Sequence, residues 1–187
     1  MANYNWLDVG VPAEFADAVG RNWIGDQTAR HKLRDLLDTY RESKRMKNRV
    51  IVLSGPASSG KEFLAACALK HMAQKHNLWP CMVAANALVS HLLGGKSLQV
   101  RVTLGMTDLT DPAVEAKCLV VYELGRESEV KVVRDILRGL FYQRKLNCLL
   151  TILCTHLSSD DCMERYDLLD VAHVSVSTQK HLEKRSL

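Results

Sequence analysis

The stretch of sequence with the clearest chemical potential is residues 55–62, which read Gly-Pro-Ala-Ser-Ser-Gly-Lys-Glu. Two glycines at this spacing, followed by a lysine, occupy the fixed positions of a phosphate-binding loop, G-x-x-x-x-G-K-[ST]. In such a loop the backbone amides surround an anion, and the lysine reaches the outer phosphates of a nucleotide. The last position normally carries a hydroxyl that ligates Mg²⁺, but here it is Glu62. The motif therefore predicts nucleotide binding, while nucleotide hydrolysis needs a separate argument.

The flanks of this loop have the character that the motif requires. Residues 50–54 are apolar and mostly β-branched, which predicts a buried strand, and residues 63–72 are rich in Ala and Leu, which predicts a helix. The alternative is a Gly- and Ser-rich connection between a strand and a helix, with an exposed lysine. The residues predicted to bind the nucleotide are Gly55, Pro56, Ala57, Ser58, Ser59, Gly60, Lys61 and Glu62.

The composition bounds the class of protein. A chain of 187 residues is long enough for one substantial α/β domain and short for two. It contains no uncharged apolar run of about 18 residues, so we expect no membrane span. Residues 1–8 lack the basic start and apolar core of a secretory signal. We therefore expect a cytoplasmic protein.

Cysteines and basic residues allow two further expectations. None of the six cysteines forms a C-x-x-C pair, which favours buried free thiols in a reducing compartment over a zinc site, and no metal ligands are predicted. Basic residues cluster within residues 41–49 and 180–185 of a chain with net charge +4. Such clusters either contact nucleic-acid phosphates or are simply solvated faces.

Strands and helices are predicted to alternate along the chain. Predicted strands are residues 50–54, 81–85, 118–124, 148–154 and 171–176. Predicted helices are a short one opened by Pro12, residues 27–43 capped by Asp26, residues 63–72, one capped by Asn86, residues 129–143, and a short one after residues 158–161. Residues 96–112 are predicted as either a strand or an irregular insert, and the tail after Ser177 as an exposed helix or disordered.

This alternation predicts a largely parallel sheet with helices on both faces. In such folds ligands bind at the carboxyl ends of the strands. Ser54, Glu123 and Thr155 end three of the predicted strands, so we expect them to meet there. Val132, Val133, Ile136, Leu137 and Leu140 are expected to face inward from the helix over residues 129–143.

Taken in order, several short segments resemble one family, the AAA+ helicase loaders of the DnaC type and their transposon relatives, the IstB-like ATPases. Residues 10–15 are similar to the family's G-[IV]-P start, and residues 53–61 to its Walker A motif. Residues 119–125 stand where the family has an apolar strand, two acidic residues and Leu-Gly. Residues 150–158 stand where it has a strand ending in Thr-Ser-Asn-Leu. The resemblance covers residues 9–176.

The resemblance implies an α/β fold, a P-loop NTPase of AAA+ type: a three-layer sandwich around a mainly parallel five-stranded sheet, with little or no C-terminal lid. It divides the chain into an N-terminal segment (1–25), an AAA+-like P-loop domain (26–177) and a polar tail (178–187). It also implies ATP or ADP as the cofactor.

The departures from the family concern metal binding and hydrolysis. Glu62 replaces the hydroxyl that ligates Mg²⁺, and Tyr122 replaces the first acidic residue of Walker B. Mg²⁺ therefore loses its usual protein contacts, although the Glu62 carboxylate could itself reach a metal. Losing one charge-stabilising group commonly costs about 10²–10³-fold in rate. These changes predict slow or absent hydrolysis.

Three residues match catalytic positions of the family. Glu123 stands at the second, catalytic carboxylate, with a surface strand-end carboxylate as the equally weighted alternative. His156 stands where an Asn helps to place water, with a structural histidine as the alternative. Arg165 matches one of two arginines that act across a subunit boundary, and Leu169 falls near the other.

The resemblance leads to two hypotheses of function. The first is a DnaC/IstB-like nucleotide-binding protein of DNA replication or a mobile element, with weak or no ATP hydrolysis, that regulates or delivers a partner on DNA. Its expected partners are a replicative helicase, a transposase or a related AAA+ subunit, with single-stranded DNA, within a homo- or hetero-oligomer. Residues 41–49 and 96–101 are the candidates for DNA contact. The second is a pseudo-ATPase that serves as an adaptor subunit; a small-molecule kinase fits less well.

Overall fold

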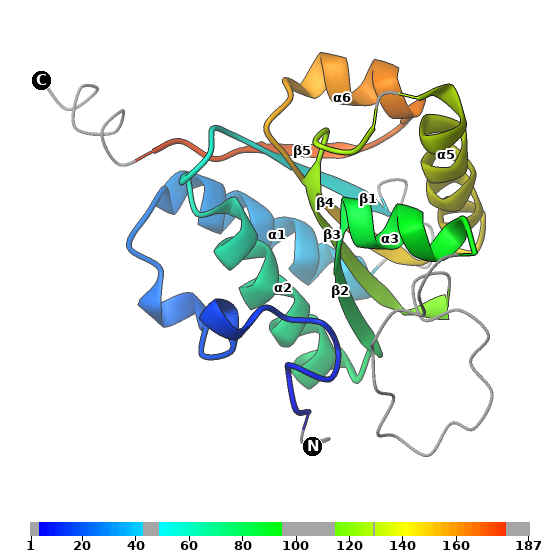
Figure 1. The fold of residues 1–187 in the computed structure, drawn as a ribbon. Helices are drawn as coiled ribbons and strands as arrows, with labels where there is room; N and C mark the ends of the chain where they lie inside the picture. Colours follow the sequence, from blue (N-terminus) through cyan, green and yellow to red (C-terminus); the bar gives the residue numbers. More distant parts are fainter. Residues whose placement is uncertain (1–3, 43–48, 95–114, 129, 179–187) are drawn as a thin grey trace, which may run out of the picture.

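A computed structural model describes residues 4–42, 49–94, 115–128 and 130–178. Five parallel strands form one sheet in the order β2-β3-β4-β1-β5 (Figure 1). The strands are β1 (Val50–Ser54), β2 (Pro80–Ala84), β3 (Cys118–Leu124), β4 (Leu150–Thr155) and β5 (Ala172–Ser175). The predicted five-stranded parallel sheet is confirmed.

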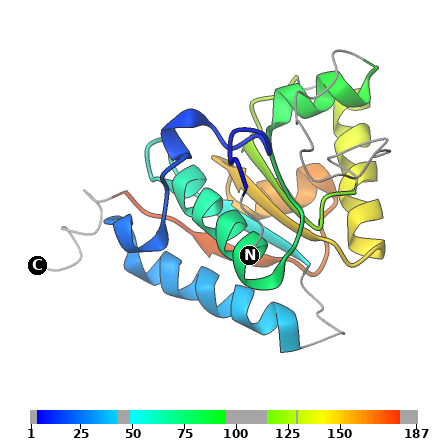
Figure 2. The same ribbon diagram turned by 90° about the horizontal axis from the view of Figure 1, so that it is seen from below.

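Helices cover both faces of this sheet. One face carries α1 (Gln27–Glu42) and α2 (Lys61–His76), and the other carries α3 (Ala85–Leu92), α5 (Lys131–Leu146) and α6 (Ser159–Tyr166) (Figures 1 and 2). The buried side chains form two clusters accordingly. On β1, Ile51 and Leu53 join the α1–α2 cluster, while Val50 and Val52 join the other, as the two-residue period of a strand requires.

The start of α1 follows the predicted cap. Oδ1 of Asp26 accepts a hydrogen bond from the Ala29 amide at 3.0 Å. Oδ2 of the same carboxylate accepts one from the Ser177 amide at 3.1 Å. Asp26 is buried and therefore fastens the first helix to the chain that follows β5.

Other predictions about the elements were wrong. Asn86 does not cap α3, because the helix already begins at Ala85 and its N-cap is Ala84, which provides no side-chain cap. Val132 does not face inward: it is 51% exposed, because the buried stripe of α5 runs through Val133, Leu137 and Leu140. The helix also begins later than expected, at Lys131.

The predicted burial of the cysteines holds for four of the six. The described structure contains no disulfide, and Cys81, Cys118, Cys154 and Cys162 are buried. Cys148 differs: it is exposed at a left-handed turn (φ 55°) before β4 begins. Strand β4 therefore begins at Leu150, two residues later than predicted, because the chain uses this turn to leave α5.

Residues 4–23 pack across α2 and reach the edge of the sheet. The Met82 amide donates to the Val9 carbonyl at 2.9 Å, and a Cβ on Gly10 would lie 2.0 Å from the Met82 carbonyl oxygen. After Pro12 comes the 3-10 helix η1 (Ala13–Phe15), as predicted, and then η2 (Gly20–Asn22). The ring of Phe15 meets that of Phe63 on α2 edge-on.

A buried lysine anchors this segment. Nζ of Lys70, on α2, donates hydrogen bonds to the carbonyls of Phe15, Ala16 and Ala18 at 2.8, 2.6 and 3.1 Å. The ammonium also lies 5.4 Å from the ring centre of Trp6. A single side chain thereby satisfies the carbonyls at the end of η1.

No helix in the described ranges is long and apolar enough to cross a membrane. The predicted insert at 96–112 and most of the basic stretch at 41–49 lie outside the described residues, as does the tail from 179 onward.

Candidate nucleotide-binding site

Both glycines of the phosphate-loop motif stand where a side chain would collide with its surroundings. A Cβ on Gly55 would lie 2.2 Å from the carbonyl oxygen of Val176, which follows β5. Gly60 has φ +80°, and a Cβ there would lie 2.7 Å from the ring of Trp23. The packing of the loop therefore demands glycine at both positions.

The loop is a closed turn that leads directly into a helix. The Gly55 amide donates to the Thr155 carbonyl at 3.2 Å, and the Ser59 amide donates to the Pro56 carbonyl at 3.2 Å. Helix α2 begins at Lys61, earlier than predicted, so its N-terminus lies at the end of the loop. A helix N-terminus favours negative charge, which suits this turn to an anion.

The side chain of Lys61 is only 4% exposed and faces a cavity of about 200 Å³. Its Nζ donates to the Pro56 carbonyl at 3.1 Å and lies 3.1 Å from Oε1 of Glu62. Both of these partners of Lys61, the Pro56 carbonyl and the Glu62 carboxylate, belong to the loop itself. A phosphate entering here would have to compete with the Glu62 carboxylate.

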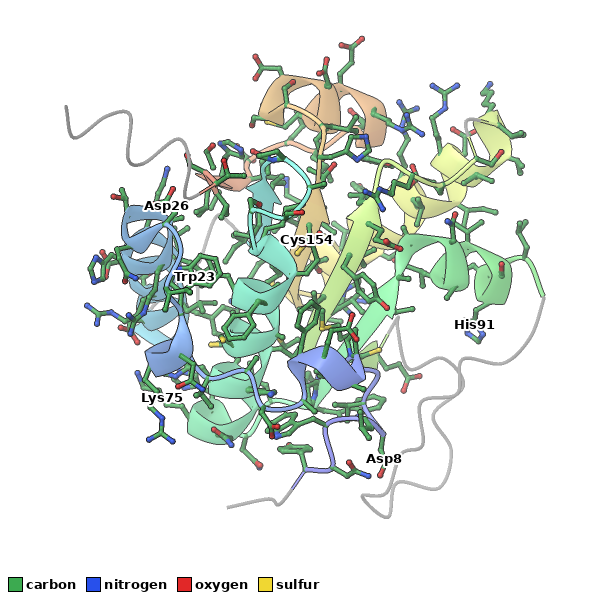
Figure 3. The ribbon with its side chains drawn as sticks, turned by 60° about the vertical axis from the view of Figure 1, so that its left-hand side comes forward. Asp8, Trp23, Asp26, Lys75, His91 and Cys154 are labelled. Atoms are coloured by element: carbon green, nitrogen blue, oxygen red, sulfur yellow. The ribbon has the colours of Figure 1, made fainter. Side chains whose placement is uncertain are left out.

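Elements far apart in the sequence build this cavity. Its lining comes from η1, the loop, α2, and the ends of β3 and β4: Glu14, Phe15, Ala57, Ser58, Lys61, Glu62, Tyr122, Glu123, Arg126, Cys154 and His156. Cys154, on β4, lies behind the start of α2, and its thiol contacts the Lys61 carbonyl (Figure 3). Of the predicted catalytic residues, the cavity brings together Glu123 and His156 but not Arg165.

Glu123 reaches the cavity through an irregularity at the end of β3. The pairing of β3 with β4 shifts register between Val121 and Leu124, and Glu123 adopts a left-handed φ of 57°. Leu124 stays buried, while Oε1 of Glu123 accepts a hydrogen bond from Nη1 of Arg126 at 3.2 Å. The carboxylate is therefore presented at the surface of the cavity, already paired with a cation.

Tyr122 lies near the end of β3, next to Glu123, and lines the cavity. Burial raises the pKa of its hydroxyl, and the nearby Glu123 and Glu14 raise this pKa further. The group is therefore a neutral phenol at neutral pH. It supplies no negative charge to a divalent cation.

The ends of β3 and β4 hold each other in place. Oγ1 of Thr155 donates to the Leu124 carbonyl at 2.8 Å and accepts from the Leu157 amide at 3.1 Å. A Cβ on Gly125 would lie 3.1 Å from the ring of His156, which is exposed. His156 thus borders the turn that follows Glu123. Ser54, the third predicted strand end, is hydrogen-bonded to Nε2 of His173 at 2.6 Å.

Arg165 lies on α6 and points to a partner that the sequence did not reveal. Its Nη2 donates to Oε1 of the fully buried Glu127 at 3.1 Å. The same carboxylate accepts hydrogen bonds from the Tyr166 hydroxyl and from the Gly125 amide. Burial and this contact raise the pKa of Tyr166 well above its usual range. Glu127 therefore fastens the turn after β3 to α6, through partners up to 39 residues away in sequence.

A second cavity, of about 360 Å³, lies on the other side of the loop. Its lining is Asn22, Trp23, Ile24, Gly25, Ser58, Ser59, Gly60 and Phe63. Trp23 lies between α1 and α2 and stacks on Phe63 with ring centres 5.9 Å apart (Figure 3). The hydroxyl of Ser59 is buried and has no hydrogen-bond partner among the described residues. The two cavities together flank the loop with charged groups on one side and aromatic rings on the other.

The charges around the first cavity do not favour a bare polyphosphate. Three carboxylates, Glu14, Glu62 and Glu123, line it against the two cations Lys61 and Arg126. Among the described residues, no group of three or more His, Cys, Asp or Glu side chains is arranged to hold a metal. A phosphate fits the turn, the lysine and the unpartnered Ser59 hydroxyl. The described lining does not contain a cluster of side chains arranged to bind Mg²⁺.

No family model and no curated protein matches the sequence. Solved structures do match the fold. The DnaC helicase loader superimposes with a TM-score of 0.65 at 15% identity, over 88% of this chain and 99% of the loader's. This chain has a DnaC-like AAA+ fold. DnaI has a TM-score of 0.65 at 19% identity, over 91% of this chain and 96% of its own.

The replication initiator DnaA, bound to AMPPCP and single-stranded DNA, matches the same AAA+ fold with a TM-score of 0.62 at 16% identity. The match covers 95% of this chain but 57% of the DnaA chain. The predicted resemblance to DnaC-type AAA+ proteins is confirmed at the level of the fold.

Proposed function

We propose that this chain is an AAA+ nucleotide-binding protein of DNA replication that hydrolyses ATP weakly or not at all and regulates or delivers a partner on DNA. The observation that carries the proposal is Lys61, which lies at the end of a closed glycine turn and faces a cavity at the carboxyl ends of the strands. The match to DnaA, whose structure contains AMPPCP and single-stranded DNA, supports this reading.

In this proposal the phosphates bind over residues 55–62 and the base binds in the second cavity. The stacked Trp23 and Phe63 and the exposed Ile24 offer an apolar lining beside the loop. Aromatic side chains favour contact with the flat face of a base. The Ser59 hydroxyl supplies a hydrogen-bonding group in the lining of the second cavity.

Weak hydrolysis follows from the groups near Lys61. Glu62 pairs with the lysine, and Tyr122 is a neutral phenol in the position of a metal-binding acid. Mg²⁺ prefers oxygen ligands in octahedral geometry, and here Glu62 and Glu123 are the carboxylates that could approach it. A bound Mg²⁺ would neutralise the charge of the phosphates. Without it, three carboxylates face a polyanion.

The catalytic residues enter the proposal with different roles. In this proposal Glu123 accepts a proton from an attacking water, and His156, which lines the same cavity, helps to position that water. Arg165 is engaged by Glu127 within the same chain, so it serves a neighbouring subunit only after leaving that carboxylate. A missing arginine finger lowers phosphoryl transfer by about 10³–10⁵-fold.

A second candidate function is a pseudo-ATPase that acts as an adaptor subunit of a larger assembly. The contact between Lys61 and Glu62 favours this candidate. Because the Glu62 carboxylate already neutralises the lysine, a nucleotide phosphate gains little binding energy from it. The partner in either case is a replicative helicase, a transposase or another AAA+ subunit.

The two candidates separate in a binding and turnover experiment. Fluorescent ATP and ADP analogues are titrated into the protein with and without Mg²⁺, followed by a phosphate-release assay with and without single-stranded DNA. Binding that is lost in Lys61→Ala, with turnover raised by DNA, supports the replication ATPase. Binding without turnover supports the adaptor. Absence of binding to the correctly folded protein under all conditions contradicts nucleotide recognition altogether.

A double variant tests why hydrolysis is weak. Glu62→Thr with Tyr122→Asp introduces a hydroxyl and an acid at two positions that line the cavity with Lys61. If the metal ligands alone are missing, turnover should rise well above that of the unchanged protein. Unchanged turnover with tight nucleotide binding would assign the defect to another part of the site, and would favour the adaptor.

A further inference from the structure

A third cavity lies between α1 and α2 and shares no lining residue with the two cavities beside the loop. The two helices run side by side on the same face of the sheet (Figures 1 and 2). The cavity has a volume of about 220 Å³, and η2 closes one end of it. This space suits one large side chain of a partner rather than a whole cofactor.

The floor of this cavity is apolar. Leu33 and Leu37 on α1 face Leu64 and Ala68 on α2 across it, and all four are buried. Each pair has the four-residue spacing that places side chains on one face of a helix. Water in the crevice therefore has few partners there, and its replacement by an apolar side chain is favourable.

The rim of the cavity is basic. Arg21, Arg30 and Arg34 line it, and no Asp or Glu does. Arg34 approaches Asp35 at 3.9 Å, with the two side chains 62% and 72% exposed, and an ion pair in that setting contributes little. Arg30 donates from Nη1 to the amide oxygen of Gln27, which leaves its charge in place.

Two other groups complete the electrostatic picture. The Asp38 carboxylate, the next acid along α1, accepts a hydrogen bond from Lys75 on α2 at 2.8 Å, and this contact lowers its pKa. Its charge is thus already compensated. Nε2 of His71, which also lines the cavity, is buried without a hydrogen-bond partner among the described residues. The crevice presents positive charge and an unused polar atom around an apolar floor.

We propose that the crevice between α1 and α2 docks an acidic amphipathic segment of a partner protein. One aliphatic or aromatic side chain of the partner enters between Leu33, Leu64 and Ala68. Flanking carboxylates of the partner pair with Arg30 and Arg34 on the rim, where bidentate geometry is accessible. The proposal concerns a surface away from the phosphate loop and does not depend on nucleotide binding.

The lining favours a peptide over nucleic acid. A strand of DNA would use the arginines but would leave the apolar floor unfilled, and its bases need aromatic platforms on which to stack. His71 is the one aromatic ring in the lining, and it is half-buried. A peptide uses both the charge of the rim and the apolar floor.

The experiment uses a fluorescein-labelled probe peptide of about twelve residues, long enough for three helical turns. The probe carries Leu and Phe at helical spacing among Glu and Asp. One control peptide replaces its Leu and Phe by Ser, and the other replaces its acids by Lys. Anisotropy gives the affinity, and amide shifts of the ¹⁵N-labelled full chain locate the site. A twelve-nucleotide deoxythymidine strand is tested in parallel.

Two protein variants separate the contributions of charge and shape. Arg30→Glu with Arg34→Glu reverses the rim and should weaken the probe at least about tenfold, because like charges then face one another. Cys67→Phe adds a ring at a half-buried position of the lining and should weaken the probe by excluding its apolar anchor, with the rim intact. Arg134→Glu on α5, across the sheet, is the matched control and should leave affinity unchanged.

The proposal is supported if the probe shifts amides of α1 and α2, both control peptides bind at least tenfold more weakly, and the two variants act as stated. It is overturned if the probe does not bind the folded protein, if its shifts map elsewhere, or if the reversed rim binds it equally well. Shifts of the same amides by the oligonucleotide but not by the peptide would also overturn it, and would identify a nucleic-acid surface.

Discussion

The carboxylate of Glu62 lies 3.1 Å from the ammonium of Lys61, so the final residue of the loop motif contacts the residue before it. Lys61 also donates to the Pro56 carbonyl, and its side chain is almost wholly covered. An arriving phosphate would gain the cation but would also approach the carboxylate beside it. In the proposed function, this contact opposes the binding of a nucleotide phosphate to Lys61.

Replacing Glu62 by Gln should strengthen nucleotide binding. The amide keeps the size of the side chain and removes the charge that opposes a phosphate. We expect affinity to rise about five- to thirtyfold, which corresponds to about 1–2 kcal/mol. Titration of a fluorescent ADP analogue without Mg²⁺ measures it. Glu164→Gln, an exposed acid on α6, is the control and should have no effect. Weaker binding in Glu62→Gln would mean that this carboxylate assists the ligand.

Glu127→Ala should destabilise the fold strongly. Its side chain is fully buried and holds Arg165, Tyr166 and the Gly125 amide. Removing one partner of a buried ion pair costs about 3–5 kcal/mol, because the other charge stays buried. Urea unfolding monitored by circular dichroism gives this value. Glu123→Ala breaks the exposed pair with Arg126 and should cost under about 1 kcal/mol. Equal effects of the two variants would refute the structural role of Glu127.

The sequence foretold the parts of the site that depend on neighbours along the chain. The strand–loop–helix around Lys61 follows from local composition and glycine spacing, and the ends of β3 and β4 follow from apolar runs. Glu127 could not be found this way, because its arginine is 38 residues away and no local pattern links them. The packing of Trp23 against Gly60 could not be predicted for the same reason.

Errors at the edges of elements have a similar origin. Val132 was predicted on the inner face of α5 from its apolar character alone. In the structure the buried face of α5 runs through Val133 and Leu137 and leaves Val132 exposed. Residue type also suggested Asn86 as a cap, whereas β2 ends at Ala84 and α3 begins at the next residue, Ala85. Tertiary packing decides such boundaries, and local propensity does not.

Lys70→Met should loosen the N-terminal segment. The variant keeps an unbranched apolar side chain but removes the ammonium from the carbonyls of Phe15, Ala16 and Ala18. The Phe15 carbonyl still accepts from the Ala18 amide, so the loss of a donor falls on the other two carbonyls. Leaving buried polar groups unsatisfied costs about 1–3 kcal/mol each at most, and water entering at the edge reduces the sum. Amide hydrogen exchange of residues 13–19 and urea unfolding measure the change. Lys75→Met, on the same helix with an exposed partner, is the control; a matching loss of protection there would contradict this view.

Acid should weaken the fold partly through His173. Burial lowers the pKa of this ring from 6.5, and the nearby Lys32 lowers it further. The unfolded chain therefore binds the proton first, so stability falls as pH falls through the range below about 6.5. His173→Gln, which can still hydrogen-bond with Ser54, should flatten the decline between about pH 6.5 and 5. Denaturant unfolding across that range measures the decline, with His156→Gln, at an exposed ring, as the control variant.

Gly55→Ala and Gly139→Ala should change stability in opposite directions. At Gly55 the new methyl would meet the Val176 carbonyl oxygen at 2.2 Å, and both residues directly follow the paired ends of β1 and β5. Forcing an extra carbon into such a space costs about 1–3 kcal/mol. At Gly139, in the middle of α5, nothing lies within 4 Å of the added carbon, so alanine should stabilise the helix by about 0.5–1 kcal/mol. Thermal unfolding of both variants gives the two signs. If Gly55→Ala left the stability unchanged, the chain after β5 would not pack tightly against the loop. The glycine at this position of the motif would then be explained by ligand binding and not by packing within the fold.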